Sequence, residues 1–311
     1  HAHPGIPDPL WSRGLGDVYK RQHLYKRTKS KNLCLAGGVA LNCVANGKLL
    51  RSGLFDDIWI QPASGDAGGA VGCALFTWYQ YLNSQRKAND KSDFMKGTFL
   101  GPEFKNGSIE SFLKKNEYSY ETLTNEKLSE KIADLIADKK IIGWFQGRME
   151  FGPRALGSRT IIGDARSSDM QKTMNLKIKF RESFRPFAPS IRAENISDYF
   201  EIDRESPYML LVANVKKGKQ IEMSDEQNSY FGLEKLNVVR SEVPAITHVD
   251  YSARIQSVNK ITNIRYHQML TKFNDKYGCP VIVNTSFNVR GEPIVCTPKD
   301  AYLCFMRTEM D

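Results

Sequence analysis

The chain has 311 residues, with 44 Lys and Arg against 35 Asp and Glu, and 41% of its residues are hydrophobic. This composition is typical of a folded polypeptide long enough for about two domains, and it excludes a disordered or collagen-like chain. No apolar run reaches the roughly 18 residues that a membrane-spanning helix needs, so the sequence predicts no transmembrane segment.

The net charge of +9 is concentrated in one part of the chain. Residues 143–192 carry 10 basic and 4 acidic side chains, whereas residues 193–311 carry 14 basic and 16 acidic ones. A local excess of this kind indicates a pocket for a small anion rather than a diffuse surface for a polyanion.

The cysteines stand singly among apolar neighbours, with no CxxC pair and no Cys/His cluster at zinc spacing. They are Cys34, Cys43, Cys73, Cys279, Cys296 and Cys304. This pattern predicts buried free thiols in a reducing compartment, and therefore a cytoplasmic protein.

The first 22 residues show no helical or strand period. Within them, Asp17–Gln22 resembles a translated sequencing adaptor, so we expect residues 1–22 to lie outside the native fold. For the same reason, His1 and His3 are not candidates for metal ligands.

Two successive strand–turn–helix units follow. Apolar runs at 33–36 and 58–61 predict short strands, and each is followed by a glycine-rich turn and a helix, the helices ending near residues 50 and 82. Residues 83–96 are polar and aperiodic, and we expect the domain boundary there.

The part beyond this boundary mixes helices and strands without a regular βαβ repeat, which predicts an α+β fold. The predicted elements are a helix at 125–139, a strand at 141–145, a basic helix at 170–178, a strand in FRPFAPSI (184–191), a polar excursion at 215–240, a helix at 264–277, a buried strand in PVIVNTSFN (280–288) and a helix that opens at 297–298. Because the chain stops just past this last helix, we expect a fragment truncated at both ends.

Two glycine-rich stretches lie in the first part. Gly37 and Gly38 stand between a strand and a helix, where bare N–H groups approach a phosphate, and we expect Asn42 one turn into that helix, able to bond a ribose or phosphate. In SGDAGGAVGCAL, Asp66 places a carboxylate beside backbone without bulky side chains, as a metal or phosphate requires. Plain turn geometry for the glycines and a helix N-cap role for Asp66 are the alternatives.

The segment GRMEFGPRALGSR combines Arg148, Arg154 and Arg159 with Glu150, three glycines and a proline. Planar guanidinium groups held on a tight turn bind phosphate or carboxylate in a bidentate way. A surface loop without a ligand is the alternative, although the glycines and the proline imply a fixed geometry.

Three cations alternate in KIKFR, namely Lys177, Lys179 and Arg181, so they share one face if the segment is extended, and Arg185 keeps the same parity. Cations on one strand face repel one another unless an anion lies between them. The alternative is contact with an RNA backbone, for which interleaved aromatic residues such as those at 180, 184 and 187 are typical.

Polar groups also follow two strand-like segments. Thr285, Ser286 and Asn288 come at the end of an apolar strand, where ligands of sheet proteins commonly bind, with a β-turn as the alternative. The segment THVDYSAR (247–254) adds a histidine, an aspartate and an arginine. No GxSxG, HExxH, P-loop or GxGxxG motif is present, which excludes Ser, Cys and classical metal hydrolases.

Six stretches, taken together and in this order, closely resemble the O-carbamoyltransferase family of antibiotic and nodulation-factor biosynthesis (NodU/CmcH type). They are LAGGVALNCVANGKL, PASGDAGGAVGCAL, GRMEFGPRALGSRTI, KFRESFRPFAPSI, THVDYSARIQ and VNTSFNVRGEPIVCTPKDA. The resemblance implies a YrdC-like domain that joins carbamoyl phosphate to ATP, giving carbamoyl-adenylate and pyrophosphate. It also implies a domain with an actin-like ATPase (ASKHA) fold that passes the carbamoyl group to a hydroxyl of a small-molecule acceptor.

The resemblance further implies where these sites lie. Residues 97–311 match the YrdC-like domain, and the ligands of carbamoyl phosphate and ATP would be Lys179, Arg185, Ser286 and Asn288, with Arg148, Arg154 and Arg159 as additions. Residues 23–95 match only the last part of the ATPase-fold domain, with Gly37, Gly38 and Asn42 in the adenylate contact region and Asp66 as a metal ligand. Mg²⁺ would assist adenylation, and Fe²⁺ or a similar metal would bind in the complete protein.

In the family, the HxxxH metal ligands and the acceptor-activating histidine would lie upstream of this chain. The acceptor therefore stays open among sugar and other natural-product hydroxyls. YrdC-like domains also occur in proteins that make threonylcarbamoyl-adenosine on tRNA, so an RNA-binding module is the alternative function. The concentration of charge in residues 143–192 counts against that alternative.

Overall fold

The computed structural model describes residues 10–87 and 93–311, and their side chains from residue 19 onward. The chain forms two units, His1–Lys87 with Leu210–Val212, and Ala88–Met209 with Ala213–Asp311. The division falls inside the polar segment 83–96, where the sequence predicts a boundary. Among the described residues, no helix is both long and apolar enough to cross a membrane.

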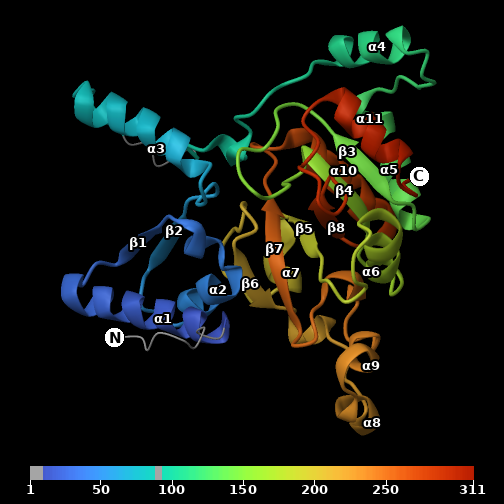
Figure 1. Ribbon diagram of the computed structural model, residues 1–311. Helices are drawn as coiled ribbons and strands as arrows, with labels where there is room; N and C mark the ends of the chain where they lie inside the picture. The colour runs from blue at the N-terminus through green and yellow to red at the C-terminus, as the bar shows by residue number, and fades with distance from the viewer. Residues whose placement is uncertain (1–9, 88–92) are drawn as a thin grey trace. The chain divides into compact units, whose positions relative to one another are not determined.

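The first unit contains two strand–turn–helix units, as predicted. Its elements are α1 (Leu10–Thr28), β1 (Asn32–Leu35), a 3₁₀ turn (Gly38–Leu41), α2 (Cys43–Arg51), β2 (Asp57–Ile60), α3 (Gly68–Phe76) and a π-helical turn (Thr77–Tyr81). Strands β1 and β2 pair in parallel, and α1 and α2 lie together beside them (Figure 1). Leu33, Leu49 and Phe55 form a small core, against which Tyr25 packs edge-on.

Helix α1 corrects one expectation. The sequence predicts no regular element in residues 1–22, yet α1 begins at Leu10 and runs past Gln22 to Thr28. The first segment has its prolines at positions 4, 7 and 9, so the chain after them is free to form helical hydrogen bonds without an apolar period. The origin of residues 1–22 stays a prediction, and residues 1–9 lie outside the described part of the chain.

The second unit is built on a six-stranded mixed sheet. Its strands are β3 (Ile142–Phe145), β4 (Arg159–Asp164), β5 (Ala188–Arg192), β6 (Leu211–Asn214), β7 (Ser252–Val258) and β8 (Val281–Ser286), in the order β3-β4-β8-β5-β7-β6. Strands β5 and β7 pair in parallel, whereas β4 and β8, β5 and β8, and β3 and β4 pair antiparallel. This arrangement confirms mixed helices and strands without a regular βαβ repeat.

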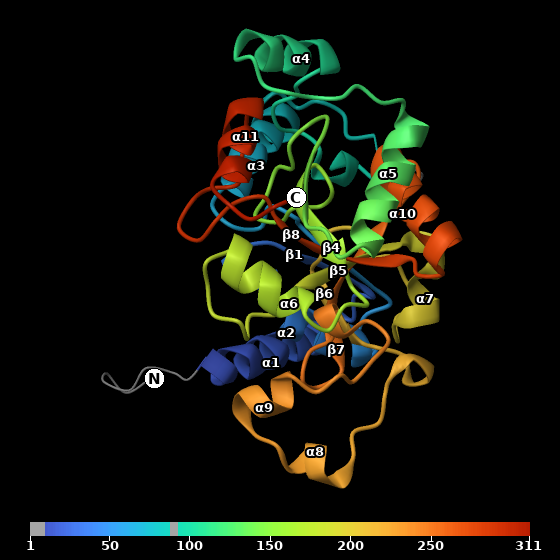
Figure 2. The ribbon, with the colours of Figure 1, turned by 90° about the vertical axis from the view of Figure 1, so that its right-hand side faces the viewer.

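Helices pack on both faces of this sheet. The helices of this unit are α4 (Asn106–Lys115), α5 (Asn125–Ala137), α6 (Met170–Thr173), α7 (Ile196–Tyr199), α8 (Asp225–Ser229), α9 (Gly232–Leu236), α10 (Ile264–Tyr277) and α11 (Pro298–Met306). Of these, α8 and α9 extend away from the sheet (Figure 1). Shorter 3₁₀ and π-helical turns span Lys96–Thr98, Met174–Ile178, Ala193–Asn195, Lys217–Lys219 and Pro244–Ile246. Figure 2 shows α5 and α10 side by side on one side of the strands and α6 on the other.

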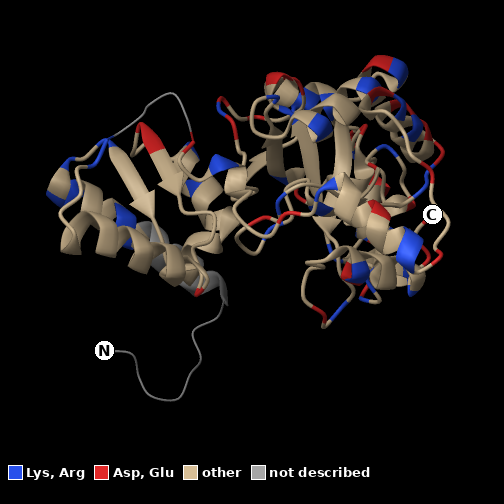
Figure 3. Cartoon of the chain, turned by 90° about the horizontal axis from the view of Figure 1, so that it is seen from above, with Lys and Arg blue, Asp and Glu red and all other residues tan. Residues whose placement is uncertain are grey.

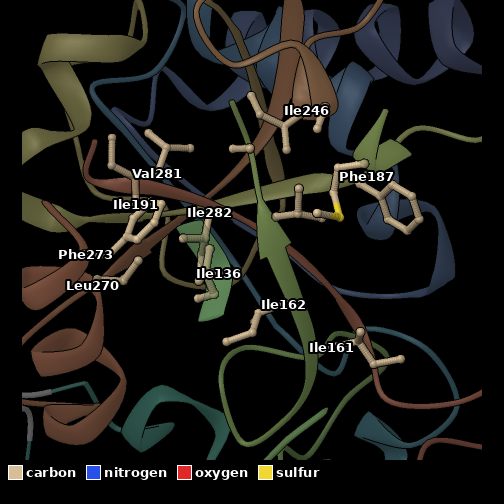
Figure 4. Close-up of a cluster of buried hydrophobic side chains, with 14 of the residues drawn as sticks. Ile136, Ile161, Ile162, Phe187, Ile191, Ile246, Leu270, Phe273, Val281 and Ile282 are labelled. Carbon is tan, nitrogen blue, oxygen red and sulfur yellow. The ribbon is translucent and has the colours of Figure 1, made fainter. Parts of the chain in front are cut away.

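Successive residues of β4 face opposite sides of the sheet, so this strand contacts the helices on both sides. A Cβ on Gly163 would come 2.8 Å from the sulfur of Met170 in α6, so this position faces α6. Asp164, one residue later, pairs with Arg166, whose guanidinium lies 4.9 Å from the ring of Phe273 in α10. The buried apolar side chains of both layers form one continuous core, part of which Figure 4 shows.

The helix expected at 170–178 is confirmed. Helix α6 runs into a π-helical turn over Met174–Ile178, and Met170, Met174 and Ile178, at helical spacing, are all buried. Lys177 and Lys179 therefore do not lie on an extended segment. Another expectation is wrong. Of the six cysteines, only Cys279 and Cys304 are buried, while Cys34 and Cys73 are exposed, because α3 packs no residue into a core and β1 belongs to a two-stranded sheet.

Candidate anion-binding site

The side chain of Lys179 joins three of the predicted site residues. Its Nζ donates to the carbonyl oxygens of Ser286 and Asn288, both at 2.7 Å, and to Asn288 Oδ1 at 2.6 Å. Ser286 Oγ lies 3.3 Å from the same nitrogen and donates to Asn288 Oδ1 at 2.7 Å. An ammonium has only three hydrogens, so the four oxygens around it compete for donors.

The local backbone explains how Lys179 reaches this position. The π-helical turn Met174–Ile178 ends at Lys179, whose N–H donates to Met174 O at 2.9 Å, and Phe180 follows with a φ of 46°. Such turns occur frequently at functional sites, because the extra residue redirects the chain. Burial, together with the nearby charge of Arg181, lowers the pKa of Lys179 to about 7.

Further cations surround this lysine, and we call Lys179, Arg181, Arg185 and Arg290 the cation cluster. Arg181 donates to Asn175 Oδ1 at 2.6 Å and lies 4.9 Å from the ring of Phe187. Glu182 is the carboxylate between the outer two, 3.3 Å from Arg185 Nε and 3.4 Å from Arg290 Nη1. Because one carboxylate faces two guanidinium groups here, the outer part of the cluster keeps an excess of positive charge.

The residues 147–159, which we call the arginine loop, divide into different environments. Arg159 is fully buried, and its guanidinium donates to the carbonyls of Gln146 at 2.7 Å and Ser158 at 3.1 Å while lying over the ring of Phe145. Arg148 is half-exposed and reaches Gly101 O at 3.2 Å and Glu103 at 3.4 Å. Arg154 is partly buried.

These bonds change the set of candidate anion ligands. The guanidinium of Arg159 already serves carbonyl oxygens in the interior, so we leave Arg159 out of the proposed ligands and keep Arg148 and Arg154. Burial also lowers the pKa of Arg159 from its ordinary value.

The two groups meet at one end of the sheet. The N–H of Phe287 donates to Arg159 O at 3.0 Å, directly between Ser286 and Asn288. In the β4–β8 pairing, Thr160 lies opposite Ser286. The strand register therefore brings the end of the arginine loop next to the turn that Lys179 holds. Figure 3 shows basic and acidic segments interspersed over this unit.

A pocket of about 570 Å³ adjoins the cation cluster. It is lined by Gln171, Phe184, Pro186, Phe187, Lys235, Leu236 and residues 245–250. Two residues of its walls contact the cation cluster. Gln171 donates to Arg185 O at 3.1 Å, and the ring of Phe187 packs against the guanidinium of Arg181. His248 lies here, its Nδ1 3.2 Å from Ser252 Oγ, and burial lowers its pKa.

The predicted residues of the first unit take simpler roles in the structure. Gly37 adopts a φ of 93°, which favours glycine, and Gly38 opens the following 3₁₀ turn. Asn42 is the N-cap of α2, accepting from Ala45 N at 3.1 Å, rather than a residue one turn inside the helix. Asp66 is exposed and precedes α3, whose N-cap is Ala67.

A metal does not fit Asp66 on this chain alone. Within residues 10–87 and 93–311, no three His, Cys, Asp or Glu side chains are grouped so that they could hold a metal ion. A stable site needs three or more such ligands, and one carboxylate does not provide them. A metal at Asp66 stays a prediction that depends on ligands outside the described residues.

Three features of the site lie outside the predicted ligand set. Arg181 is part of the KIKFR alternation, but only the structure shows it beside Lys179 and Phe187. Arg290 follows the NTSFN turn by two residues, and this proximity in sequence is the signal that was available. Glu150 is the third, and its carboxylate is turned into the arginine loop rather than outward.

Comparison with known proteins identifies the family of the chain. The family model "Carbamoyltransferase C-terminus" matches residues 133–311, and "Carbamoyltransferase N-terminus" matches residues 17–75. The chain belongs to the carbamoyltransferase family. The first of these matches covers more than half of the chain and includes the cation cluster and the arginine loop.

Curated relatives agree with this membership. An uncharacterized Synechocystis protein, sll1178, is 60% identical over 93% of this chain and 47% of its own length. Nodulation protein NolO of Bradyrhizobium diazoefficiens is 39% identical over 93% of this chain and 49% of its own length. Nodulation protein U of Sinorhizobium fredii is 31% identical, covering 84% and 40%. The chain thus spans about half the length of the curated relatives it matches.

Solved structures give a weaker likeness. Full-length HypF in its phosphate- and nucleotide-bound form matches with a TM-score of 0.37 and 16% identity, over 58% of this chain and 20% of that one. HypF of T. kodakarensis matches with a TM-score of 0.35 and 16% identity, over 57% and 20%.

Proposed function

We propose that the second unit of this carbamoyltransferase chain binds carbamoyl phosphate and ATP and forms carbamoyl-adenylate. The observation that carries the proposal is the convergence of Lys179, Ser286 and Asn288 within one hydrogen-bonded group. Arg185 of the cation cluster would add a further cation. On this proposal, Arg148 and Arg154 of the arginine loop would add further cations. Both substrates are phosphates, and cations fixed around a transferring group stabilise the charge that develops during phosphoryl transfer.

The reaction we propose balances with water as a third reactant. Water attacks the phosphorus of carbamoyl phosphate and breaks its P–O bond to the carbamoyl group. Inorganic phosphate leaves with the oxygen of that water, and an oxygen of the carbamate that remains attacks the α-phosphorus of ATP. Pyrophosphate leaves with the electron pair of the broken P–O bond, and carbamoyl-adenylate remains. Mg²⁺ would supply further positive charge to the phosphates. The apolar walls of the adjoining pocket offer a surface for the adenine base.

The complete protein would then transfer the carbamoyl group to a hydroxyl of a small-molecule acceptor. On this proposal Gly37, Gly38 and Asn42 contact the adenylate in the first unit, and Asp66 contributes one metal ligand. The N-terminus of α2 beside Asn42 supports this, because unpaired N–H groups at helix starts attract phosphate.

The test is exchange of radiolabelled pyrophosphate into ATP. We expect exchange that depends on carbamoyl phosphate and that is lost in Lys179→Met. Absence of carbamoyl-phosphate-dependent exchange in a protein that contains this chain at full family length would overturn the proposal.

A further inference from the structure

A buried carboxylate closes the arginine loop from inside. Glu150 is 7% exposed, and its Oε1 accepts hydrogen bonds from three backbone N–H groups, those of Leu156 at 2.7 Å, Ser158 at 2.8 Å and Arg159 at 3.3 Å. Converging N–H groups of this kind form the concavity in which proteins bind anions. Here the anion is a side chain of the loop itself.

The carbonyl groups of the same stretch are held from the other side. Ala155 O accepts from Asn284 Nδ2 at 3.0 Å, Leu156 O from Gln256 Nε2 at 2.8 Å, and Gly157 O from Gln146 Nε2 at 2.7 Å. These amides come from β8, from β7 and from the end of β3, so the sheet fixes one side of the loop backbone. Glu150 is the group that fixes its N–H side.

We call the three hydrogen bonds that Glu150 accepts the clamp, and Arg154 lies within the segment that they close. The bond from Leu156 N to Glu150 closes a ring of chain between residues 150 and 156, and Arg154 lies within that ring. Because both ends of the ring are buried and bonded, the backbone that carries Arg154 has little freedom. A guanidinium on a fixed backbone loses less conformational entropy when it binds an anion.

We propose that Glu150 is a positioning residue, which fixes the arginine loop so that Arg154 is pre-organised for a phosphate-bearing substrate. The inference rests on the proposed function, since it concerns the same site. It assigns Glu150 no contact with the substrate. The carboxylate acts through the backbone N–H groups that it accepts.

The test compares two buried carboxylates in the 311-residue chain. Glu150→Ala removes the clamp, and we expect its affinity for carbamoyl phosphate, measured by calorimetry, to fall at least tenfold. The matched control is Asp164→Ala, because Asp164 is 3% exposed and bonds to Arg166 instead of the arginine loop. We expect Asp164→Ala to lower the melting temperature while keeping the affinity within threefold of the native value.

Two further measurements separate positioning from folding. Glu150→Gln keeps an acceptor oxygen, so we expect it to retain affinity within about threefold, and formate added to Glu150→Ala to restore part of what is lost. Hydrogen exchange at Leu156 N and Ser158 N should be slow in the native chain and at least tenfold faster in Glu150→Ala. Should Glu150→Ala not fold, Glu150→Asp takes its place in both measurements, because the shorter side chain draws the carboxylate away from these N–H groups.

The possible failures are distinguishable. Equal loss of affinity in Glu150→Ala and Asp164→Ala, or native affinity in Glu150→Ala, overturns the positioning role. If the native chain binds neither carbamoyl phosphate nor inorganic pyrophosphate, the proposed function fails instead. The exchange rates of the two amides then decide whether Glu150 fixes the loop.

Discussion

Arg185 and Lys177 are two cations of the same segment that the structure separates in role. The side chain of Arg185 is 52% exposed and belongs to the cation cluster, whereas that of Lys177 is 54% exposed and pairs with Glu309 at 2.7 Å. Their equal exposure makes them a matched pair for substitution. Neither contributes much to folding, because exposed ion pairs are worth little.

We predict that Arg185→Gln weakens binding of carbamoyl phosphate by roughly tenfold to a hundredfold, since a charge-assisted hydrogen bond contributes about 1.5–3 kcal/mol. The control Lys177→Gln should leave affinity within about twofold. Titration calorimetry measures both, and chemical denaturation should show less than about 0.5 kcal/mol of change in either variant. An equal effect of the two substitutions on affinity would contradict the assignment of Arg185 to the site.

Lys179 makes binding dependent on pH. Its pKa is lowered by burial to about 7, and only the protonated ammonium attracts a phosphate. An anion therefore binds the protonated form and raises the pKa, so affinity is highest below pH 7 and falls as the pH rises. We predict a loss of up to about tenfold per pH unit between pH 7.5 and 9.

Dissociation constants for carbamoyl phosphate at pH 6.5, 7.5, 8.5 and 9 test this prediction. The variant Lys179→Met lacks the titrating group and should bind weakly with a flat profile over this range. A native affinity that stays constant to pH 9 would show that Lys179 does not respond to the anion.

At the scale of elements, the period of the apolar residues was a reliable guide to the helices. Leu128, Ile132 and Ile136 lie on one side of α5, as their spacing predicts. Met170, Met174 and Ile178 have helical spacing and are buried, as the helix predicted at 170–178 requires, whereas the alternation of Lys177 and Lys179 would place them on one face only in an extended segment. Nothing local in the sequence indicates a π-helical turn.

The convergence at the site was predictable only in part. Ser286 and Asn288 could be placed at a strand end from the apolar run before them, and the resemblance connected them to Lys179. The interior role of Arg159 was not visible, because its burial depends on Gln146 and Phe145, which other parts of the fold place around it.

Gly157 tests how tightly the arginine loop is held. It adopts a φ of 102°, and an added Cβ would come 2.5 Å from the ring of Tyr266. We predict that Gly157→Ala lowers the free energy of unfolding by about 2 kcal/mol or more, from strain and overpacking together. The control is Gly107→Ala in α4, which meets no atom within 4 Å and should stabilise the protein by up to about 1 kcal/mol. Urea denaturation measures both, and similar values for the two would contradict a tightly held loop.

At the scale of the whole molecule, interior bonds and ion pairs hold much of the positive charge of residues 143–192. Of the basic residues in 143–192, Arg159 and Lys179 are buried. Others face carboxylates, as Arg166 faces Asp164 and Lys177 faces Glu309. Many basic side chains of this segment are therefore engaged in interior hydrogen bonds or ion pairs, which leaves few of them to contact an RNA phosphate backbone. This favours a small anion over the alternative of a tRNA-binding module.

Filter binding of tRNA over 50–300 mM salt tests the alternative. We predict no retention at micromolar chain and physiological salt, because an RNA that contacted six or more cations would show a steep salt dependence, with a log–log slope of roughly −4 or beyond. Carbamoyl phosphate contacts few charges, so its dissociation constant should change by less than about tenfold over the same range. Strong tRNA retention with a steep slope, together with its loss in Arg185→Gln, would instead assign the cation cluster to RNA.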